Sequence, residues 1–256
     1  VVGLATPSET VTVNGSGADY RKGEFFQEKV TVSNSSVPVW QSVAVTTSGG
    51  GSNPTGNVFV PKTPEPFSYD LDGNQLSDGR WNYTWDGENR LIRLVASTAV
   101  GPQQRIDFEY DWLGRRIGKK VWNNTAGTGT PAIDLKFVYD GWNLIAILNS
   151  SLTLQNSFLW GLDLSGSVQG ARGVGGLVSV RPAGGPAHFV GYDGNGNVAG
   201  LVDGSNGSKS ADYEYGPFGE TIRLTGPMAK ANVHRFSTKF TDDETGLLYY
   251  GYRYYS

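Results

Sequence analysis

Cysteine is absent from the sequence, although the chain has 256 residues. A chain without thiols forms no disulfide, offers no cysteine nucleophile and builds no zinc site on cysteine ligands. Methionine is nearly absent as well, since Met228 is the only one and the sequence begins at Val1. We therefore expect a fragment or a processed product without a disulfide framework.

Long apolar runs and a surplus of positive charge are also missing. The longest apolar cluster, residues 144–148, is strand-sized, whereas a bilayer span needs roughly 20 residues. The formal net charge is −3, and a surface that binds nucleic acid is basic. We therefore expect no membrane span and no nucleic-acid partner. The one dense basic cluster is interpreted as the solvent face of a hairpin; it comprises Arg115, Arg116, Lys119 and Lys120.

Glycine and aromatic residues, by contrast, are plentiful. Glycine accounts for 36 residues, about twice its ordinary usage, and aromatic residues reach 12%. Together with many Asn, Asp and Val residues, this mixture favours short strands joined by tight turns and disfavours helices. The composition therefore predicts an all-β protein.

One stretch of the sequence illustrates the expected unit. Ile106, Phe108 and Tyr110 alternate with acidic residues, which is typical of a strand with one buried face. An Asp-x-x-Gly turn follows at 111–114, and a second alternating run leaves it at 117–121. The stretch predicts a β-hairpin.

The same aromatic-acid-glycine phrase recurs along the chain, with looser copies at 158–163 and 213–220. Such a unit cannot bury an apolar face alone, so neighbouring hairpins must stack to make a core. We therefore predict a ribbon of antiparallel β-hairpins in which the repeat has a structural role. The motif residues of the ribbon are Tyr69, Asp70, Gly73, Trp85, Asp86, Tyr110, Asp111, Gly114, Tyr139, Asp140, Tyr192, Asp193, Gly196, Tyr215 and Gly219.

We expect three segments along the chain. Residues 1–62 form an N-terminal β segment, either a small sandwich or additional hairpins of the same sheet. Residues 63–225 form the hairpin ribbon, and residues 226–256 form a closing segment. The Gly- and Ser-rich stretch 48–54 and the Pro-rich stretch 61–66 place the first boundary near residue 62. A surface loop inside one continuous sheet explains both stretches equally well.

The closing segment contains an Asp-Glu-Thr-Gly turn at 243–246 and then a run of tyrosines. We predict that this run forms one strand with aromatic side chains on both faces, which requires cover from both sides. The acids at 242–244 are expected to be solvated, so they receive no acid–base role. The motif residues of this segment are Gly246, Tyr252, Arg253 and Tyr254.

These ordered motifs resemble the RHS/YD-repeat family over roughly residues 67–256, including the start of the RHS-associated core. The resemblance implies a curled, shell-like sheet of hairpins that encloses a C-terminal polypeptide in toxin-bearing members. It also implies a secreted, extracellular or cell-surface protein whose partners are the remainder of the parent polypeptide or a C-terminal toxin. Many members continue into Asp-Pro motifs that perform self-cleavage. The sequence stops at Ser256, before such motifs, so we expect no autoproteolytic site here.

Two other functions remain open from the residues. Unpaired edges of the first and last strands could template self-association into a filament. A glycan-binding platform is the second, although aromatic residues beside turns favour cross-strand pairs. The candidate platform residues are Trp81, Tyr83, Trp85, Tyr110, Trp112, Trp122, Tyr139, Trp142, Trp160, Tyr192, Tyr213 and Tyr215.

Several stretches resemble metal- or phosphate-binding motifs but lack residues that those motifs require. Asp70 and Asp193 begin stretches that look like calcium loops, but the required Gly and Glu are missing from the sixth and twelfth positions. The Gly-rich stretch 170–185 lacks the Lys-Ser/Thr ending of a phosphate loop, so we expect an irregular loop. His188 and His234, the only histidines, are expected to pack or to face solvent. We therefore assign no catalytic, cofactor-binding or metal-binding residue and predict a structural, non-enzymatic scaffold.

Overall fold

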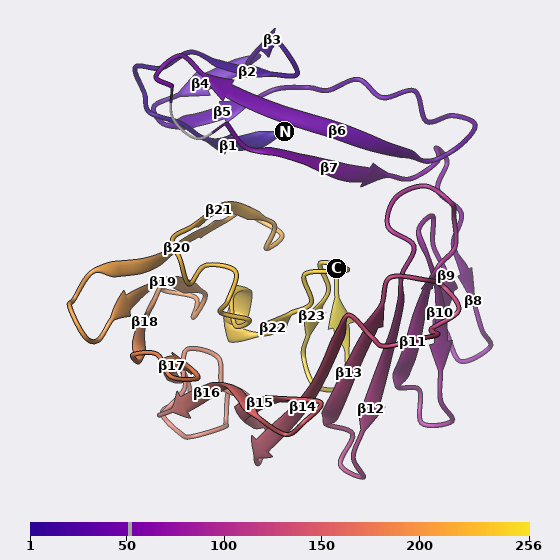
Figure 1. Cartoon of the computed structure of the whole chain (residues 1–256), viewed down its shortest axis with the longest axis vertical. Coiled ribbons are helices and arrows are strands. Elements are labelled where there is room, and N and C mark those ends of the chain that lie inside the picture. Colours follow the sequence, from indigo (N-terminus) through magenta and orange to yellow (C-terminus); the bar gives the residue numbers. More distant parts are fainter. Residues whose placement is uncertain (51–52) are drawn as a thin grey trace. The chain divides into compact units, whose positions relative to one another are not determined.

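The computed structural model describes residues 1–50 and 53–256. Nearly all regular structure in these residues is antiparallel β-sheet, with one short 3₁₀ turn, so the all-β prediction is confirmed (Figure 1). The flexible stretch expected at 48–54 lies partly outside the described residues. No helix within the described residues is long and apolar enough to cross a membrane.

The chain divides into two compact units. The first comprises Val1–Ile106 and Val121–Pro131, and the second comprises Asp107–Lys120 and Ala132–Ser256. The repeat region contributes to both.

The first unit holds two small sheets and the first hairpins of the repeat. One small sheet has the order β1-β5-β4 and the other the order β3-β2-β6-β7, with Val11, Val13 and Phe26 in their core. From β8 to β11 each strand pairs with its neighbour in sequence. The strands are β1 (Val2–Leu4), β2 (Val11–Val13), β3 (Ser16–Gly17), β4 (Tyr20–Lys22), β5 (Phe25–Gln27), β6 (Val39–Thr47), β7 (Thr55–Val60), β8 (Ser68–Tyr69), β9 (Gln75–Ser77), β10 (Trp81–Trp85) and β11 (Leu91–Ala96).

The second unit contains a longer sheet in which the strands follow the order of the sequence from β12 to β21, without a crossover. This order is what a ribbon of consecutive hairpins produces. Residues 105–106 of β12 and 121–122 of β13 fall in the first unit. The strands are β12 (Arg105–Tyr110), β13 (Arg116–Trp122), β14 (Ile133–Asp140), β15 (Asn143–Asn149), β16 (Leu154–Trp160), β17 (Leu177–Pro182), β18 (His188–Tyr192), β19 (Val198–Asp203), β20 (Lys209–Tyr215) and β21 (Thr221–Thr225).

Within the second unit the sheet curves, and the closing segment 226–256 lies on its concave side (Figure 1). The segment contains the 3₁₀ turn η1 (Phe236–Thr238) and a small sheet of β22 (Phe240–Thr241), β23 (Leu248–Tyr249) and β24 (Tyr254–Tyr255). Buried side chains of the segment share one hydrophobic core with the curved sheet. The concave face is therefore covered by the chain itself.

The prediction of one long tyrosine strand is wrong. Tyr249 lies in β23 and residues 254–255 form β24, which pairs with β23, while Tyr250 and Tyr252 lie between the two strands. The chain reverses between them at Gly251, whose φ of +90° is readily adopted by glycine. The Tyr250 amide donates to the Arg253 carbonyl across this reversal (2.8 Å).

The prediction of an irregular loop throughout 170–185 is also wrong. Leu177–Pro182 forms β17, which pairs with β16 on one side and β18 on the other. Leu177 and Val180 are buried in the core, so their burial outweighs the weak strand preference of the surrounding glycines.

Candidate functional site

The repeated aspartate closes a hairpin turn with its own carboxylate. At Asp111, one carboxylate oxygen accepts the backbone N–H groups of Leu113 (3.0 Å) and Arg115 (2.9 Å). The other oxygen accepts the Arg115 Nε–H (2.7 Å). Gly114 takes the left-handed conformation (φ +80°) that this turn requires. Burial alone would raise the pKa of the Asp111 carboxyl, but these hydrogen bonds and the Arg115 charge hold it below its usual range.

The same arrangement is present at three other motif aspartates. Asp70, Asp86 and Asp193 each accept backbone N–H groups from the second and fourth residues after them, at 2.8–3.0 Å. The side chain of the fourth residue donates to the second carboxylate oxygen in each case; these donors are Asn74, Arg90 and Asn197 (2.9, 2.7 and 2.7 Å). Their carboxylates are thus engaged in turn hydrogen bonds. No group of three or more His, Asp and Glu side chains in the described residues is placed to hold a metal ion.

Not every copy of the motif forms this turn. Asp140 pairs directly with Asn143, so Gly141 and Trp142 form a shorter two-residue loop. Gly219 (φ +87°) belongs to a turn of the same backbone form that has no aspartate, because Gly216 stands in its place.

Two further turns with a side-chain acceptor were not predicted: the turn at Asn149 has the same form, and the turn at Asp203 is one residue longer. Asn149 accepts the amides of Ser151 and Thr153 (3.0 and 2.9 Å), and Asp203 accepts the amide of Ser205 (2.8 Å). The signal was present, since an Asn amide oxygen can replace one carboxylate oxygen in a turn.

We expect Asp111→Ala to lower the free energy of unfolding of the second unit by about 1–3 kcal/mol, because backbone N–H groups and Arg115 lose a charged acceptor. Asp140→Ala is the matched control, since Asp140 lies in the shorter turn; its expected effect is below about 0.5 kcal/mol. Urea denaturation of both variants measures the difference. Equal losses of stability in the two variants would show that the turn hydrogen bonds of Asp111 do not contribute to the free energy of unfolding.

In five hairpins the aromatic residue before the turn bonds to the preceding strand. Its hydroxyl or indole N–H donates to a backbone carbonyl near the start of that strand, just after the earlier turn. This contact needs a donor, which explains why Tyr or Trp, and not Phe, stands there. The pairs are Trp85 with Gln75, Tyr139 with Arg116, Trp160 with Leu144, Tyr192 with Leu177 and Tyr215 with Val198, at 2.7, 3.0, 2.7, 2.6 and 2.9 Å.

The remaining motif residues have more varied positions. Tyr69 is exposed in β8, and Gly246 (φ +78°) forms the turn before β23. The hydroxyls of Tyr110 and Tyr254 lie 2.7 Å apart. Tyr252 is exposed and packs on Trp142, with ring centroids 4.7 Å apart. Arg253 is exposed and contributes its carbonyl to the reversal between β23 and β24. Among the twelve candidate platform aromatics, Trp112 is exposed (86%) and the others are buried or half-buried.

Two charge predictions are wrong. Arg116 and Lys119 are buried rather than on a solvent face, and Asp242 is buried rather than solvated. Arg116 donates to one Asp242 oxygen (2.6 Å) and Lys119 to the other (2.7 Å), while Lys119 also reaches Glu244 (2.6 Å). The closing segment therefore removes Arg116, Lys119 and its own Asp242 from water.

Aromatic rings complete the surroundings of Arg116. Its guanidinium lies within 4.6–5.9 Å of five ring centroids, a distance at which cation–π attraction operates. Burial alone would raise the pKa of the Asp242 carboxyl, but the charges and hydrogen bonds of Arg116 and Lys119 hold it below its usual range. The rings are those of Phe108, Phe137, Phe240, Tyr249 and Tyr254.

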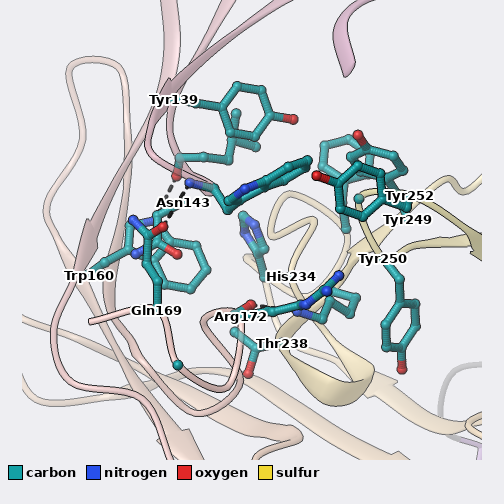
Figure 2. A pocket seen from close by; sticks show the side chains of 16 residues that line it. Tyr139, Asn143, Trp160, Gln169, Arg172, His234, Thr238, Tyr249, Tyr250 and Tyr252 are labelled. Atoms are coloured by element: carbon teal, nitrogen blue, oxygen red, sulfur yellow. Dashed lines mark hydrogen bonds between the residues drawn. The ribbon is translucent and has the colours of Figure 1, made fainter. Parts of the chain in front are cut away.

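A cavity of about 290 Å³ lies beside this cluster, within the second unit (Figure 2). Its walls come from β14–β16, the loop after β16 and the closing segment. Figure 2 shows His234 among the lining residues, with Trp160 and Gln169 on one side and Tyr249 and Tyr252 on the other. His234 is 3% exposed, and burial, helped by the positive charge of Lys239, lowers its pKa to about 3. Both histidines are buried, which is one of the two positions expected for them, packed or facing solvent. His188 Nδ1 lies 2.8 Å from Ser210 Oγ.

We expect His234 to make the second unit less stable in mild acid. Its pKa is about 3 in the folded chain against an ordinary value of 6.5, so between these pH values the unfolded chain binds the extra proton. Stability then falls as pH drops from 6.5, by at most about 1.4 kcal/mol per pH unit for this group. Urea denaturation between pH 6.5 and 4.5 should give a shallower slope for His234→Phe than for the natural chain. Parallel slopes would contradict this origin of the acid sensitivity.

Comparisons with known proteins identify relatives and similar folds. No family model matches the chain. The tRNA3(Ser)-specific nuclease WapA of Bacillus spizizenii is 30% identical over 222 residues, which cover 82% of this chain and 8% of that protein. The tRNA nuclease WapA of Bacillus subtilis is 29% identical, with the same coverage. The chain thus spans about 8% of the length of these relatives, and the nuclease activities in their names are those of the relatives.

Two solved structures share the fold. The Photorhabdus luminescens Tc holotoxin pore matches with a TM-score of 0.53 and 20% identity, over 84% of this chain and 11% of that one. The crystal structure of TcdB2-TccC3 matches with a TM-score of 0.50 and 19% identity, over the same shares. At these identities the likeness shows a shared antiparallel β fold.

Proposed function

We propose that the chain is a structural, non-enzymatic wall segment of an RHS/YD-repeat shell, in a secreted or cell-surface protein that encloses or displays a C-terminal effector. One observation carries this proposal: the closing segment 226–256 lies on the concave face of the curved sheet and is fixed there by buried ion pairs. In the proposed organisation, residues 1–62 precede the ribbon 63–225, and residues 226–256 begin the RHS-associated core.

The position of the last residues supports an effector that lies on the concave side of the curved sheet. The Tyr255 hydroxyl donates to the Phe218 carbonyl (3.0 Å), so the chain is still attached to the curved sheet at this point. A polypeptide that continued from Ser256 would start from the concave side (Figure 1). The proposed partners are therefore the rest of the parent polypeptide and its C-terminal effector.

Limited proteolysis of the parent protein tests this function. Sequencing the gene on both sides of this region defines that protein, and trypsin digestion followed by mass spectrometry then reports which parts are protected. We expect the polypeptide downstream of residue 256 to be digested at least tenfold more slowly in the parent than when it is produced alone. Equal digestion rates would contradict enclosure and favour a display or filament role.

A further inference from the structure

The cavity in the second unit has two cations, Lys239 and Arg172, among its lining residues. Lys239 is 8% exposed; its ammonium donates to the Arg172 carbonyl (2.6 Å) and lies 5.5 Å from the Tyr250 ring centroid. The Arg172 guanidinium lies 5.6 Å from the Tyr252 ring centroid, at the exposed side of the cavity. In residues 1–50 and 53–256, neither cation has an ion-pair partner.

The carboxylate that influences Lys239 is occupied elsewhere. Asp163 raises the pKa of Lys239, but burial and the nearby Arg172 charge have the larger effect and lower that pKa to about 8. Both Asp163 oxygens accept hydrogen bonds from the loop after β16: Ser165 binds one, and the amides of Ala171 and Gly173 bind the other. Burying a cation such as Lys239 without an anionic partner costs free energy, so the site favours an anionic ligand.

The cavity walls favour an anionic ligand that also carries a flat apolar ring. Trp142 and Trp160 both line it, and Trp142 packs against Tyr252 at the mouth. The wall amides are already used: Gln169 accepts the Trp142 amide and donates to the Asp140 carbonyl, both at 3.0 Å. Aromatic walls with few free polar groups suit a ring that can stack on them.

His234 supplies an unused polar atom in this setting. Its Nδ1 is buried and has no hydrogen-bond partner. Its ring lies nearly perpendicular to that of Trp160, with centroids 5.3 Å apart. Buried polar atoms normally have partners, so this nitrogen is available for a hydrogen bond with a ligand in the cavity.

Other ligand classes fit less well. An organic cation would suit the aromatic walls but would be repelled by Lys239 and Arg172. A metal ion would find one histidine and no free carboxylate among the lining residues. A neutral sugar would leave both cations unpaired.

We propose that this cavity binds a small aryl carboxylate, with the carboxylate toward Lys239 and Arg172, the ring against Trp142 and Trp160, and a hydrogen bond to His234. The cavity volume equals the liquid volume of roughly ten water molecules at about 30 Å³ each. Free aryl acids and the last residue of a polypeptide ending in Phe, Tyr or Trp share this chemistry. The site is independent of the scaffold role proposed above.

Titration of the whole chain with four probes tests the site by tryptophan fluorescence and isothermal calorimetry. The acids are 3-phenylpropionate and N-acetyl-glycyl-phenylalanine, and the controls are their primary amides. We expect saturable binding of at least one acid and binding at least about tenfold weaker for its amide, because a charged hydrogen bond is lost. Binding of the free acid alone, of the peptide alone or of both identifies the source. Equal affinity for acid and amide, or no saturation by either acid, would overturn the proposal.

Two variants locate the binding. Lys239→Met and Arg172→Gln should each weaken binding of the acid about tenfold. Lys209→Met, which removes an exposed lysine outside the cavity, should leave the affinity unchanged. Thermal melting checks the fold of each variant; if Lys239→Met fails to fold, the exposed Arg172 variant decides. Unchanged affinity in the folded cavity variants would refute the assignment.

Discussion

Asp242→Asn should destabilise the second unit by about 3–5 kcal/mol, because it leaves the buried Arg116 without its anion and weakens the pairing of Lys119. The Asp242 pKa is depressed below its ordinary 3.8 in the folded chain, so this contribution is complete above that pH and is lost as pH falls through the folded value. Urea denaturation at pH 7 measures the full effect.

A double variant separates the missing charge pair from lost packing. Arg116→Met with Asp242→Leu removes both buried charges, while Lys119 keeps Glu244 as its partner. We expect this double variant to recover most of the loss, because apolar replacements of buried ion pairs are often neutral or stabilising. A loss below about 1 kcal/mol in Asp242→Asn, or a double variant no more stable than the single one, would refute the importance of the ion pair.

Gly196→Ala should cost about 2–4 kcal/mol in the free energy of unfolding, of which about 1–2 kcal/mol is the left-handed conformation and the rest overpacking. Gly196 has φ +76°, and an added Cβ would lie 2.7 Å from Val174 Cγ1 and 3.2 Å from the Gly175 amide nitrogen. The Gly196 carbonyl also accepts the Thr238 hydroxyl (2.7 Å), so the turn cannot move away freely from the closing segment.

Gly207→Ala is the matched control within the same unit. Gly207 has nearly the same φ, +74°, but an added Cβ would meet nothing within 4 Å. We expect only the conformational cost, about 1–2 kcal/mol. Urea denaturation of both variants gives the difference, and equal costs would show that the contacts beneath Gly196 yield without loss.

The sequence predicted what is locally determined. Asp111 and Gly114 identify a turn because the carboxylate, the amides it accepts and the left-handed glycine lie within five residues of one another. Alternating apolar residues on either side then define the strands. The same rule wrongly extended the motif to Asp140, where the loop is one residue shorter and the carboxylate does not close the turn.

The closing segment and the cavity could not be predicted in this way. Arg116 and Asp242 are 126 residues apart, and a charged residue in an alternating strand is ordinarily exposed. Their burial follows from the curvature of the sheet, which brings the closing segment over β13. The sequence likewise did not predict that His234 and Lys239 line a cavity. Whether a buried side chain has a hydrogen-bond or ion-pair partner depends on the residues that the fold places around it.

The bonds from each Tyr or Trp to the carbonyl of the preceding strand have an evolutionary consequence. Every such bond joins a Tyr hydroxyl or a Trp indole N–H to a backbone carbonyl, whatever side chains surround it. A duplicated hairpin within the ribbon would therefore contain the donor that bonds it to the preceding strand. It would also present an equivalent carbonyl to the hairpin that follows it. Such a wall can change in length by whole hairpins without the invention of a new interface.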